Sequence, residues 1–477
     1  MRSDIGDNVR TLFSPDSIAV FGSFKELVGL GWGLLKNLND FGFKGRVYPV
    51  NPSYAEVMGL KVHPGIEEIQ GQVDLAVIIT PPPAVTSVVR QCAAKGVKAA
   101  VIVTENFAEA DQEGARLQRE LVEIRDRTGI RILGPNTVGV INARNGLITI
   151  PYLIGYDHIR QGGIAYCSQS GIAAAQCQPL QDRGYPISKM CDLGNKCDLD
   201  EVDMLEYFLA DRETTVLSMH LEDVRHGREF VDAARRFTAA KPLIVFKPAR
   251  TEAGARASAS HTASLAGNDR IYDEALKQAG ALRVDTWQEF WDVPKMFEMR
   301  PLSRGNRIGI VSHSGGAGVV AVDAAVRAGL EIAEFSPETI SKLKDISPRL
   351  ARNPVDLGPV LSPAADPFQI QEQVLRAVLS DPNLDCAFIV IYVGVLAPIQ
   401  LVAEVFERAM KDISKPVAIW VYGTRLSLLA EMSRELDSRC LPTYTDTETA
   451  LKALATQARY SRYMGQRAVS GLKREKT

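Results

Sequence analysis

The 477-residue chain lacks the features that would place it in a membrane, outside the cell or on nucleic acid. Its longest apolar run, Cys386 to Ala397, is about a dozen residues long, whereas a membrane-spanning helix needs about 20. The first residues, MRSDIGDNVRTLF, contain no apolar signal core. A net charge of −2 favours neither nucleic acid nor an anionic membrane as a partner. We therefore expect a cytoplasmic protein.

Cysteine is scarce, and it is spaced for neither disulfides nor metal. There are seven cysteines, an odd number, without a CxxC pair, and Cys191 and Cys197 lack the spacing of a metal site. We expect reduced core thiols and no bound metal. The hydrophobic content of 46% and the charged content of 23% are ordinary for a globular protein, and the length predicts two to four domains.

The first 145 residues alternate between strand and helix patterns. Apolar runs predict five strands, at Ser17–Phe21, Arg46–Val50, Leu75–Thr80, Ala99–Val103 and Arg131–Leu133. Helical patterns lie between them, at Gly31–Asp40, Pro83–Lys95 and Asp111–Arg127. This order predicts a parallel sheet with crossover helices.

A glycine-bearing loop joins the first strand to the first helix. Gly22 and Ser23 form the turn and Gly31 opens the helix, so bare N–H groups and a positive helix end are offered to a phosphate. The spacing is not GxGxxG, because six residues separate Gly22 and Gly29. The alternative is a tight turn without a ligand.

The second strand ends in Asn51-Pro52, where a dinucleotide dehydrogenase usually carries an acidic residue. A phosphorylated adenosine other than NAD therefore fits better. The turns that contain Thr80-Pro81 and Thr104-Glu105 end the third and fourth strands, where ligands of open sheets bind. We expect them to line the same crevice.

A second strand–turn–helix pattern follows at Gly163–Ser168, with Ser168, Ser170 and Gly171 in the turn and an Ala-rich helix expected over Ile172–Arg183. Either serine can cap that helix, and the N–H groups beyond can hold an anion. The turn is not a GxSxG nucleophile elbow, because Ser168 and Ala173 stand where glycines are needed.

The third section repeats this pattern. A strand at Arg307–Ser312 leads to a turn with Ser314, Gly315 and Gly316, and then to a helix at Val319–Ala328. Both copies continue to a Lys-Pro pair before another strand, Lys241-Pro242 and Lys415-Pro416. The echo predicts two similar α/β units whose turns face each other and share one phosphoryl group. Alternatively, the duplicated turns hold no ligand.

One histidine lies in an unusual segment, Thr251 to Gly267, in which thirteen of seventeen residues are Ala, Gly, Ser or Thr. Such a stretch buries little apolar area, so we expect a mobile loop that carries His261 between two sites. An Ala-rich surface helix with an incidental histidine is the alternative.

Several of these motifs together resemble the alpha subunit of ADP-forming (NDP-forming) acyl-CoA synthetases, in the succinyl-CoA synthetase superfamily. The resemblance covers nearly the whole chain, from about Asp16 to the final helix. Besides the loop at Gly22 and Gly31, it rests on VYPVNP at Val47–Pro52, GPN at Gly134–Asn136, SQSG at Ser168–Gly171, GNKCDLDEVDMLEYF at Gly194–Phe208, SHTASLAG at Ser260–Gly267 and RNPVDL at Arg352–Leu357.

The resemblance implies an α/β fold of three doubly wound units. A Rossmann-like CoA-binding domain is expected over residues 1–145, a flavodoxin-like domain with the histidine loop over 146–300, and a second flavodoxin-like domain over 301–465, before a basic tail at 466–477.

The implied reaction interconverts a small carboxylic acid, coenzyme A and ATP with a CoA thioester, ADP and phosphate. By this resemblance His261 becomes phosphorylated, Glu206 holds its other ring nitrogen, and the two glycine turns bind the phosphoryl oxygens. ATP, ADP and Mg²⁺ are expected on a separate ATP-grasp beta subunit, because the chain has no such domain. A hetero-oligomer or a homodimer is expected.

The chain departs from the family at His313-Ser314, where members usually have Asn-Ala, so a second histidine stands near the expected phosphate site. Two other functions stay open: a CoA-binding sensor or scaffold without a nucleotide-binding partner, and a nicotinamide-dependent oxidoreductase, which the missing acidic residue disfavours.

Other residues have structural interpretations. Lys196 and Asp198 either touch substrate or lie in a solvated loop, Glu201 and Asp203 are expected to be solvated, and Trp420–Tyr422 is expected in a buried strand. His220 and three further histidines are assigned no role.

Overall fold

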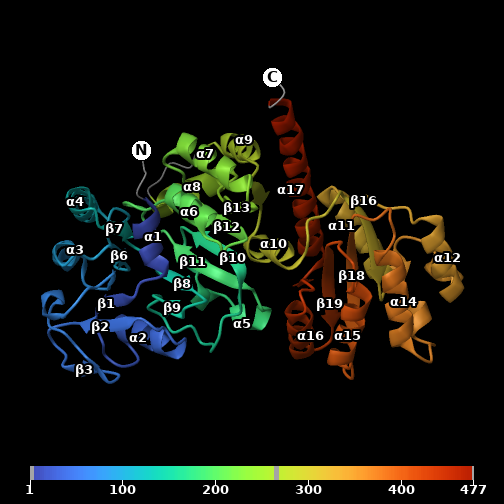
Figure 1. The fold of residues 1–477 in the computed structure, drawn as a ribbon, viewed down its shortest axis with the longest axis horizontal. Helices are drawn as coiled ribbons and strands as arrows, with labels where there is room; N and C mark the ends of the chain where they lie inside the picture. The colour runs from blue at the N-terminus through green and yellow to red at the C-terminus, as the bar shows by residue number, and fades with distance from the viewer. Residues whose placement is uncertain (1–4, 263–267, 475–477) are drawn as a thin grey trace. The chain divides into compact units, whose positions relative to one another are not determined.

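The computed structural model describes residues 5–262 and 268–474, with side chains described outside residues 5–8, 258–262 and 468–474. The chain forms two compact units. Unit 1 consists of residues 1–181 and 185–283, and unit 2 consists of residues 182–184 and 284–477 (Figure 1).

The first sheet of unit 1 is parallel throughout and has the order β2-β1-β5-β6-β7. Its strands are β1 (Ser17–Phe21), β2 (Arg46–Val50), β5 (Leu75–Ile78), β6 (Ala99–Ile102) and β7 (Arg131–Leu133). Its helices are α2 (Leu30–Asp40), α3 (Pro82–Ala94) and α4 (Gln112–Thr128), after an N-terminal α1 (Ile5–Phe13). A small hairpin, β3 (Glu56–Val57) and β4 (Leu60–Lys61), follows β2. The predicted parallel sheet is confirmed.

Alternate residues of these strands lie in two separate apolar clusters. Ile18 and Val20 of β1 belong to one, whereas Ala19 and Phe21 belong to the other. Successive side chains of a strand point to opposite faces, so both faces of this sheet are buried. This explains why its strands are continuous apolar runs rather than alternating patterns.

The second sheet of unit 1 has the order β14-β13-β12-β10-β11-β8-β9. Strands β10 to β13 pair in parallel, and β8 and β9 add an antiparallel edge. The strands are β8 (Val140–Asn142), β9 (Leu147–Ile148), β10 (Gln161–Ser168), β11 (Ile187–Asp192), β12 (Val216–His220), β13 (Leu243–Phe246) and β14 (Leu282–Val284). The domain boundary expected from the sequence, between residues 145 and 146, falls between β8 and β9, which both belong to this sheet.

Four helices accompany the second sheet: α6 (Glu201–Ala210), α7 (Gly227–Thr238), α8 (Glu252–Thr262) and α9 (Asp269–Ala279). The helix α6 packs against α7, and α7 packs against α9. One apolar cluster includes Val77 of the first sheet and Leu217 of the second, so the two sheets share a core.

The helix expected over Ile172–Arg183 is wrong. Two short 3₁₀ turns, Gly171–Ala173 and Ala175–Cys177, stand there, followed by the four-residue α5 (Leu180–Arg183). Gln178 is extended, with φ −127° and ψ 139°. Pro179 follows it, and helical backbone is disfavoured for the residue before a proline. The alanine-rich composition therefore did not make this segment one continuous helix.

Unit 2 has a six-stranded parallel sheet of order β16-β15-β18-β19-β20, with β17 paired to β15. Its strands are β15 (Arg307–Ser312), β16 (Glu331–Ile332), β17 (Val355–Asp356), β18 (Cys386–Val393), β19 (Val417–Gly423) and β20 (Thr443–Tyr444). Its helices are α10 (Trp287–Met299), α11 (Gly315–Ala328), α12 (Pro337–Ile346), α13 (Gly358–Leu361), α14 (Pro367–Leu379), α15 (Ile399–Met410), α16 (Leu426–Ser438) and α17 (Thr447–Arg474).

The two Lys-Pro pairs occupy equivalent places in their sheets. Lys241 Nζ donates to the carbonyls of Phe208, near the end of α6, and Asp211, at distances of 2.7 and 2.5 Å. Lys415 Nζ donates to the carbonyl of Leu379, at the end of α14, at 3.0 Å, and to that of Asp381. Each ammonium therefore satisfies carbonyls at the negative end of a helix. The Lys-Pro repeat that the sequence showed in the two sections thus corresponds to the same interaction in both sheets, a lysine bound to the carbonyls at the end of a helix.

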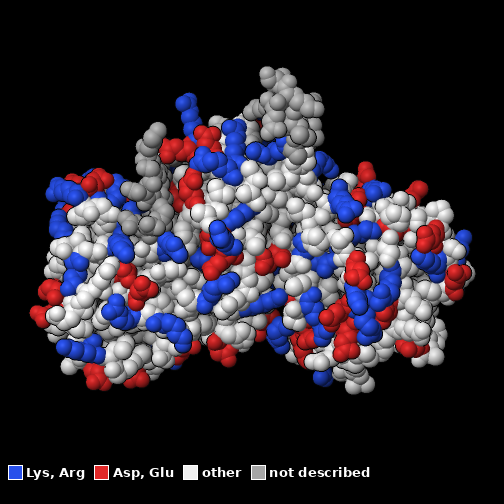
Figure 2. Space-filling view, in the orientation of Figure 1, with Lys and Arg blue, Asp and Glu red and all other residues white. Residues whose placement is uncertain are grey.

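Charges of both signs are mixed on the face that Figure 2 displays. Within the part of the chain that the structure describes, no helix has both the length and the apolar character needed to cross a membrane. All seven cysteines are unpaired; Cys177 and Cys440 are exposed, so the expectation that every thiol lies in the core is wrong for these two.

Candidate functional site

The carboxyl edge of the first sheet is built around a close approach of two glycines. A Cβ on Gly22 would lie 3.5 Å from the Cα of Gly31, and a Cβ on Gly31 would lie 2.9 Å from the carbonyl oxygen of Ser23. The N–H of Trp32 donates to that same carbonyl at 3.2 Å. A side chain at Gly31 would push the loop away from the start of α2, which explains this glycine independently of any ligand. At Gly22 the tightest approach would be 3.3 Å, to the Cβ of Ile79.

Hydrogen bonds connect the predicted CoA-site residues across neighbouring strand ends. Asn51 Nδ2 donates to the Gly22 carbonyl at 2.8 Å, and Thr104 Oγ1 donates to the Thr80 carbonyl at 2.7 Å. The N–H of Ser53, next to Pro52, donates to Asn51 Oδ1. In the sheet, β1 lies between β2 and β5. The strand that follows β1 in the chain is added on one side of it, and the later strands are added on the other side. Open sheets bind ligands at such a switch point.

The other predicted residues of this edge have varied surroundings. Ser23 Oγ lies 3.4 Å from the hydroxyl of Tyr54, and Pro81 is the N-cap residue of α3. Glu105 is exposed in the loop after β6. Thr80 Oγ1 is buried and has no hydrogen-bond partner among the described residues, so a hydroxyl at this edge of the sheet is unsatisfied.

The turn after β10 is held by a serine side chain. Ser168 Oγ accepts from the N–H of Ser170 at 2.9 Å and lies 3.0 Å from the Ser170 carbonyl, to which it can donate. The same hydroxyl lies 3.1 Å from Nδ1 of His220, at the end of β12. Neither Ser168 nor Ser170 caps a regular helix, so the expected cap is wrong and the hydroxyl instead holds the turn closed.

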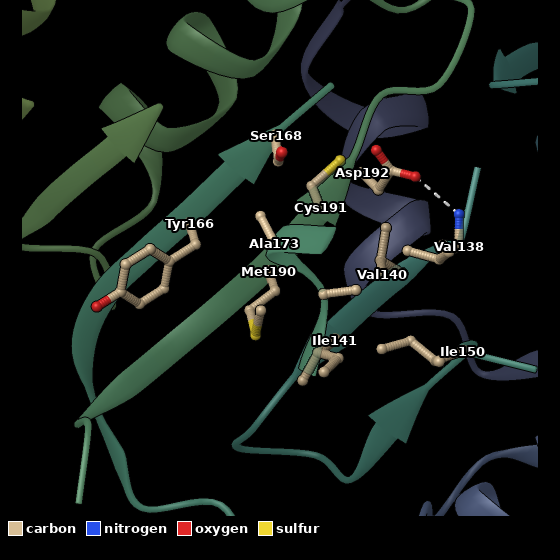
Figure 3. A pocket seen from close by; sticks show the side chains of 12 residues that line it. Val138, Val140, Ile141, Ile150, Tyr166, Ser168, Ala173, Met190, Cys191 and Asp192 are labelled. Atoms are coloured by element: carbon tan, nitrogen blue, oxygen red, sulfur yellow. Dashed lines mark hydrogen bonds between the residues drawn. The ribbon is translucent and has the colours of Figure 1, made fainter. Parts of the chain in front are cut away.

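A cavity of about 10 Å³, which is room for about one water molecule, lies beside this turn (Figure 3). Apolar side chains of Ile141, Ile150 and Met190 line it together with Asp192. Asp192 Oδ2 accepts from the N–H of Val138 at 2.8 Å, while its Oδ1 is buried without a partner among the described residues. Burial raises the pKa of Asp192 to about 6.

The GNK loop at Gly194–Lys196 carries a buried ion-pair network. Lys196 Nζ lies 3.0 Å from Glu201 Oε2 and 2.7 Å from Asp223 Oδ1, and it donates to the Asp223 carbonyl at 3.0 Å. Glu201 is fully buried, so its expected solvation is wrong. Desolvation raises the pKa of Glu201, and the Lys196 charge opposes the shift.

Asp203 is buried as well, and the side chain of Asp198 is only 4% exposed. Asp198 contacts Arg125 and Arg131 of the first domain, at 3.1 and 2.9 Å. Asp203 forms a capping box with Asp200 at the start of α6. The solvated-loop interpretation of Lys196 and Asp198 is therefore wrong, because both side chains bind protein groups.

Gln169 connects the serine turn to this network. Its Oε1 accepts from the N–H of Glu222 at 2.7 Å, and its Nε2 donates to Asp223 Oδ1 at 2.7 Å. Residues that follow three different strands, β10, β11 and β12, thus meet at one edge. Sequence reasoning missed His220, Glu222 and Asp223, although their position after the apolar run VLSM was a usable signal.

The segment with His261 is helical up to Thr262, as α8, so its backbone there is not an open loop. The His261 side chain and residues 263–267 lie outside what the structure describes. Glu206 lies on α6 and forms an ion pair with Arg236 of α7. Its role toward His261 therefore stays a prediction.

The turn after β15 repeats the pattern of the turn after β10. Ser312 Oγ accepts from the N–H of Ser314 at 3.1 Å and donates to the Ser314 carbonyl at 2.7 Å. Here a regular helix does follow, since α11 has 14 residues with Ser314 as its N-cap residue. Gly315 and Gly316 form its exposed first turn, where N–H groups are free of intrahelical partners.

His313 stands between β15 and this helix. Its Nδ1 accepts from the N–H of Tyr392 at 3.3 Å, and its Nε2 is buried with no partner among the described residues. Burial lowers the pKa of His313 to about 4. Tyr422 is half-buried and lines a cavity beside His313, so the expectation of a buried core strand is wrong at this position.

Three family models match the chain in succession. They are described as a CoA binding domain, at residues 16–143, a succinyl-CoA ligase like flavodoxin domain, at 161–297, and a ligase-CoA domain, at 308–466. The first covers the Gly22 loop, the second covers the Ser168 turn and His261, and the third covers the Ser314 turn.

Two curated relatives align over nearly the whole chain. Subunit alpha of acetate–CoA ligase [ADP-forming] II from Pyrococcus furiosus is 36% identical over 461 residues, which are 94% of this chain and 97% of that protein. Acetate–CoA ligase [ADP-forming] II from Archaeoglobus fulgidus is 35% identical over 95% of this chain and 67% of that protein.

A solved structure shows the same fold. The dinucleotide forming acetyl-coenzyme A synthetase 1 of Ca. Korarchaeum cryptofilum, in complex with phosphate and ADP, superposes with a TM-score of 0.86 at 34% identity. The alignment covers 96% of this chain and 97% of that chain. The Rossmann-like CoA-binding domain and the two flavodoxin-like domains predicted from the sequence are thereby confirmed. The chain belongs to the ADP-forming acyl-CoA ligases of the succinyl-CoA synthetase superfamily.

Proposed function

We propose that this chain is the CoA-binding, phosphohistidine-bearing alpha subunit of an ADP-forming acyl-CoA ligase. The observation that carries the proposal is the alignment with a named alpha subunit over 97% of that protein's length. The reaction joins a carboxylic acid to coenzyme A while ATP is converted to ADP and phosphate. Residues 1–145, 146–300 and 301–465 are the proposed domains.

Coenzyme A is assigned to the carboxyl edge of the first sheet. The Gly22–Ser23 loop and the start of α2 at Gly31 offer backbone N–H groups to its phosphates, and Asn51 holds that loop in place. Pro52, Thr80, Pro81, Thr104 and Glu105 complete the proposed rim. Calorimetry with coenzyme A and with NAD tests this site: binding of NAD without binding of coenzyme A would contradict it.

The proposed chemistry passes a phosphoryl group through His261. In the direction of thioester synthesis, an imidazole nitrogen takes the γ-phosphoryl group of ATP and ADP leaves. A carboxylate oxygen of the acid then attacks that phosphorus, the P–N bond breaks and an acyl phosphate forms. The CoA sulfur attacks the acyl carbon, and phosphate leaves. The serine–glycine turns at Ser168–Gly171 and Ser314–Gly316 would stabilise phosphoryl oxygens through backbone donors.

A carboxylate beside His261 would fix the ring tautomer that attacks phosphorus. Glu206 is our proposed residue, although Arg236 already neutralises it. Glu222 is a second candidate, because it follows β12 at the carboxyl edge and its N–H is held by Gln169. Comparing Glu206→Gln with Glu222→Gln decides between them: loss of the orienting carboxylate costs roughly 10²–10⁴-fold in rate.

The nucleotide and Mg²⁺ are proposed to bind an ATP-grasp beta subunit. The purified chain is then expected to show no ligase activity until that subunit is added. ATP-dependent turnover by the chain without a partner would contradict this part of the proposal.

Phosphoryl labelling tests the central claim. With partner subunit, ATP and Mg²⁺, an acid-labile and alkali-stable label is expected on His261, and His261→Ala should abolish labelling and turnover while coenzyme A still binds. His313→Ala, which removes the histidine of the turn after β15, is the matched control and should keep the label. Coenzyme A binding without any histidine label would favour the sensor or scaffold function instead.

A further inference from the structure

Unit 2 contains a cavity that is lined in part by Ser314 and Gly315 of the proposed phosphate-binding turn and extends to residues without an assigned role. It has a volume of about 540 Å³ and lies at the carboxyl edge of the sheet, beside the turn after β15. Side chains from several segments line it: His313, Asp356, Pro359, Leu361, Tyr392 and Tyr422. Cavities of 300–1,000 Å³ are typical of sites for small organic molecules.

Two tyrosines on adjacent strands form one wall. Tyr392 of β18 and Tyr422 of β19 are direct partners in the strand register, with ring centroids 5.4 Å apart. Trp420 stacks on Tyr422 at 5.2 Å and an interplanar angle of 27°. Because Trp420 supports it from the same strand, the Tyr422 ring is held in place as a flat apolar surface.

The loops that follow these two strands add exposed apolar side chains. Leu396, after β18, is 95% exposed, and Leu426, at the start of α16 after β19, is 84% exposed. Both leucines follow strands whose tyrosines line the cavity, and neither is itself among the lining residues.

Polar groups line the cavity as well. His313 Nδ1 accepts a hydrogen bond from the Tyr392 N–H, so the neutral ring carries its proton on Nε2. That N–H is buried and has no acceptor among the described residues, which leaves one donor unsatisfied beside the cavity. Gly315, in the first turn of α11, also lines the cavity. Asp356 Oδ1 accepts from the Gly358 N–H at 3.2 Å.

We propose that this cavity binds the acyl part of the carboxylic acid, with a preference for acids that carry an aromatic ring or a bulky apolar group over acetate. This assignment rests on the proposed ligase function. The ring of such an acid stacks on Tyr422 and Tyr392. An acetyl group would leave most of the 540 Å³ cavity and both tyrosine faces without contact.

Direct binding tests the cavity without requiring turnover. Calorimetry of the full chain with phenylacetate and with acetate should show at least tenfold tighter binding of phenylacetate. Tyr422→Ala should reduce that ratio at least fivefold, whereas Tyr422→Phe, which keeps the ring, should preserve it. Tyr463→Ala on α17 is the matched control, because Tyr463 does not line the cavity.

Turnover with the partner subunit adds a second measurement, the ratio of kcat/KM for phenylacetate to kcat/KM for acetate. Tyr422→Ala and Tyr392→Ala should lower this ratio, and Tyr463→Ala should not. The proposal is overturned if phenylacetate binds no tighter than acetate, or if Tyr422→Ala and Tyr463→Ala behave alike. Histidine labelling reports separately on the ligase function, so labelling with an unchanged acid preference would reject the cavity assignment and nothing else.

Discussion

The turn after β10 in unit 1 and the turn after β15 in unit 2 share a hydrogen-bond pattern but continue into different structures. In each, a serine at the strand end accepts from the N–H two residues later and pairs with the carbonyl of that same residue. After the first turn the chain forms 3₁₀ turns, and after the second it forms the 14-residue α11. The serine pattern thus fixes the turn and does not specify the next element of secondary structure.

A histidine lies close to each turn, and its surroundings differ. His220 comes from a neighbouring strand and places Nδ1 beside the Ser168 hydroxyl. His313 comes from the turn itself, and its Nε2 stays without a partner among the described residues beside a large cavity. The same serine turn therefore adjoins a buried serine–histidine contact in unit 1 and an open cavity in unit 2.

The largest expected effect concerns anion binding at the second turn. A Cβ on Gly316 would have only Ser314 Oγ within 4 Å, at 3.9 Å, so Gly316→Ala should fold normally. The added methyl group would lie where we propose the phosphoryl oxygens, and turnover with the partner subunit should fall roughly 10²-fold. Gly171→Ala makes the same change at the first turn, although its Cβ would also meet Val138 at 3.2 Å. Unchanged turnover in Gly316→Ala would exclude the second turn as a phosphate site.

Removal of the two serine hydroxyls should cost stability unequally. Ser168→Ala and Ser312→Ala each remove the side-chain acceptor of a part-buried backbone N–H, at about 1–3 kcal/mol of unfolding free energy. The loss should be larger for Ser168→Ala, because His220 also loses its contact. Urea denaturation measures both, with Ser312→Thr as the control that keeps the hydroxyl. An equal loss would show that the His220 contact contributes nothing.

The two Lys-Pro lysines should be equivalent. Lys241→Met and Lys415→Met keep the apolar stem and remove the ammonium that binds helix-end carbonyls. Each should lower the unfolding free energy by about 1 kcal/mol. Lys44→Met, at an exposed position, serves as the control. If the unfolding free energy falls in only one of the two variants, the two Lys-Pro pairs are alike in sequence but do not contribute alike to stability.

The smallest effect is on pH dependence. Burial lowers the pKa of His220 to about 3 and that of His313 to about 4, from an ordinary 6.5. Below pH 6.5 the unfolded chain therefore binds protons that the folded chain does not. The contribution of each neutral histidine to the free energy of unfolding is present above pH 6.5 and is lost as pH falls toward 4. Between about pH 7.5 and 6.5 each histidine should remove roughly 0.4 kcal/mol. His313→Gln should flatten this slope in a urea series, and an unchanged slope would contradict the buried neutral ring.

The sequence by itself determined the elements whose signals are local. Five apolar runs became the strands of the first sheet, and the Gly22 and Gly31 spacing became a close packing of loop on helix. The repeated serine–glycine turns and the Lys-Pro pairs recur in both sheets. These features are set by residues close together in the chain, because strand burial, turn geometry and helix ends each depend on a few neighbouring positions.

Only the tertiary structure decided which polar groups are buried and what they contact. The sequence predicted a solvated Glu201 and left Lys196 open between a substrate contact and a solvated loop, and sequence reasoning missed their partner Asp223. In the structure Lys196 and Glu201 are buried, and Lys196 pairs with both carboxylates. His220 gained a partner 52 residues away, and the cavity beside His313 is also lined by Tyr392, which lies 79 residues from that histidine. The physical reason is that burial of a charge and the shape of a cavity depend on non-local contacts, which residue spacing along the chain does not encode.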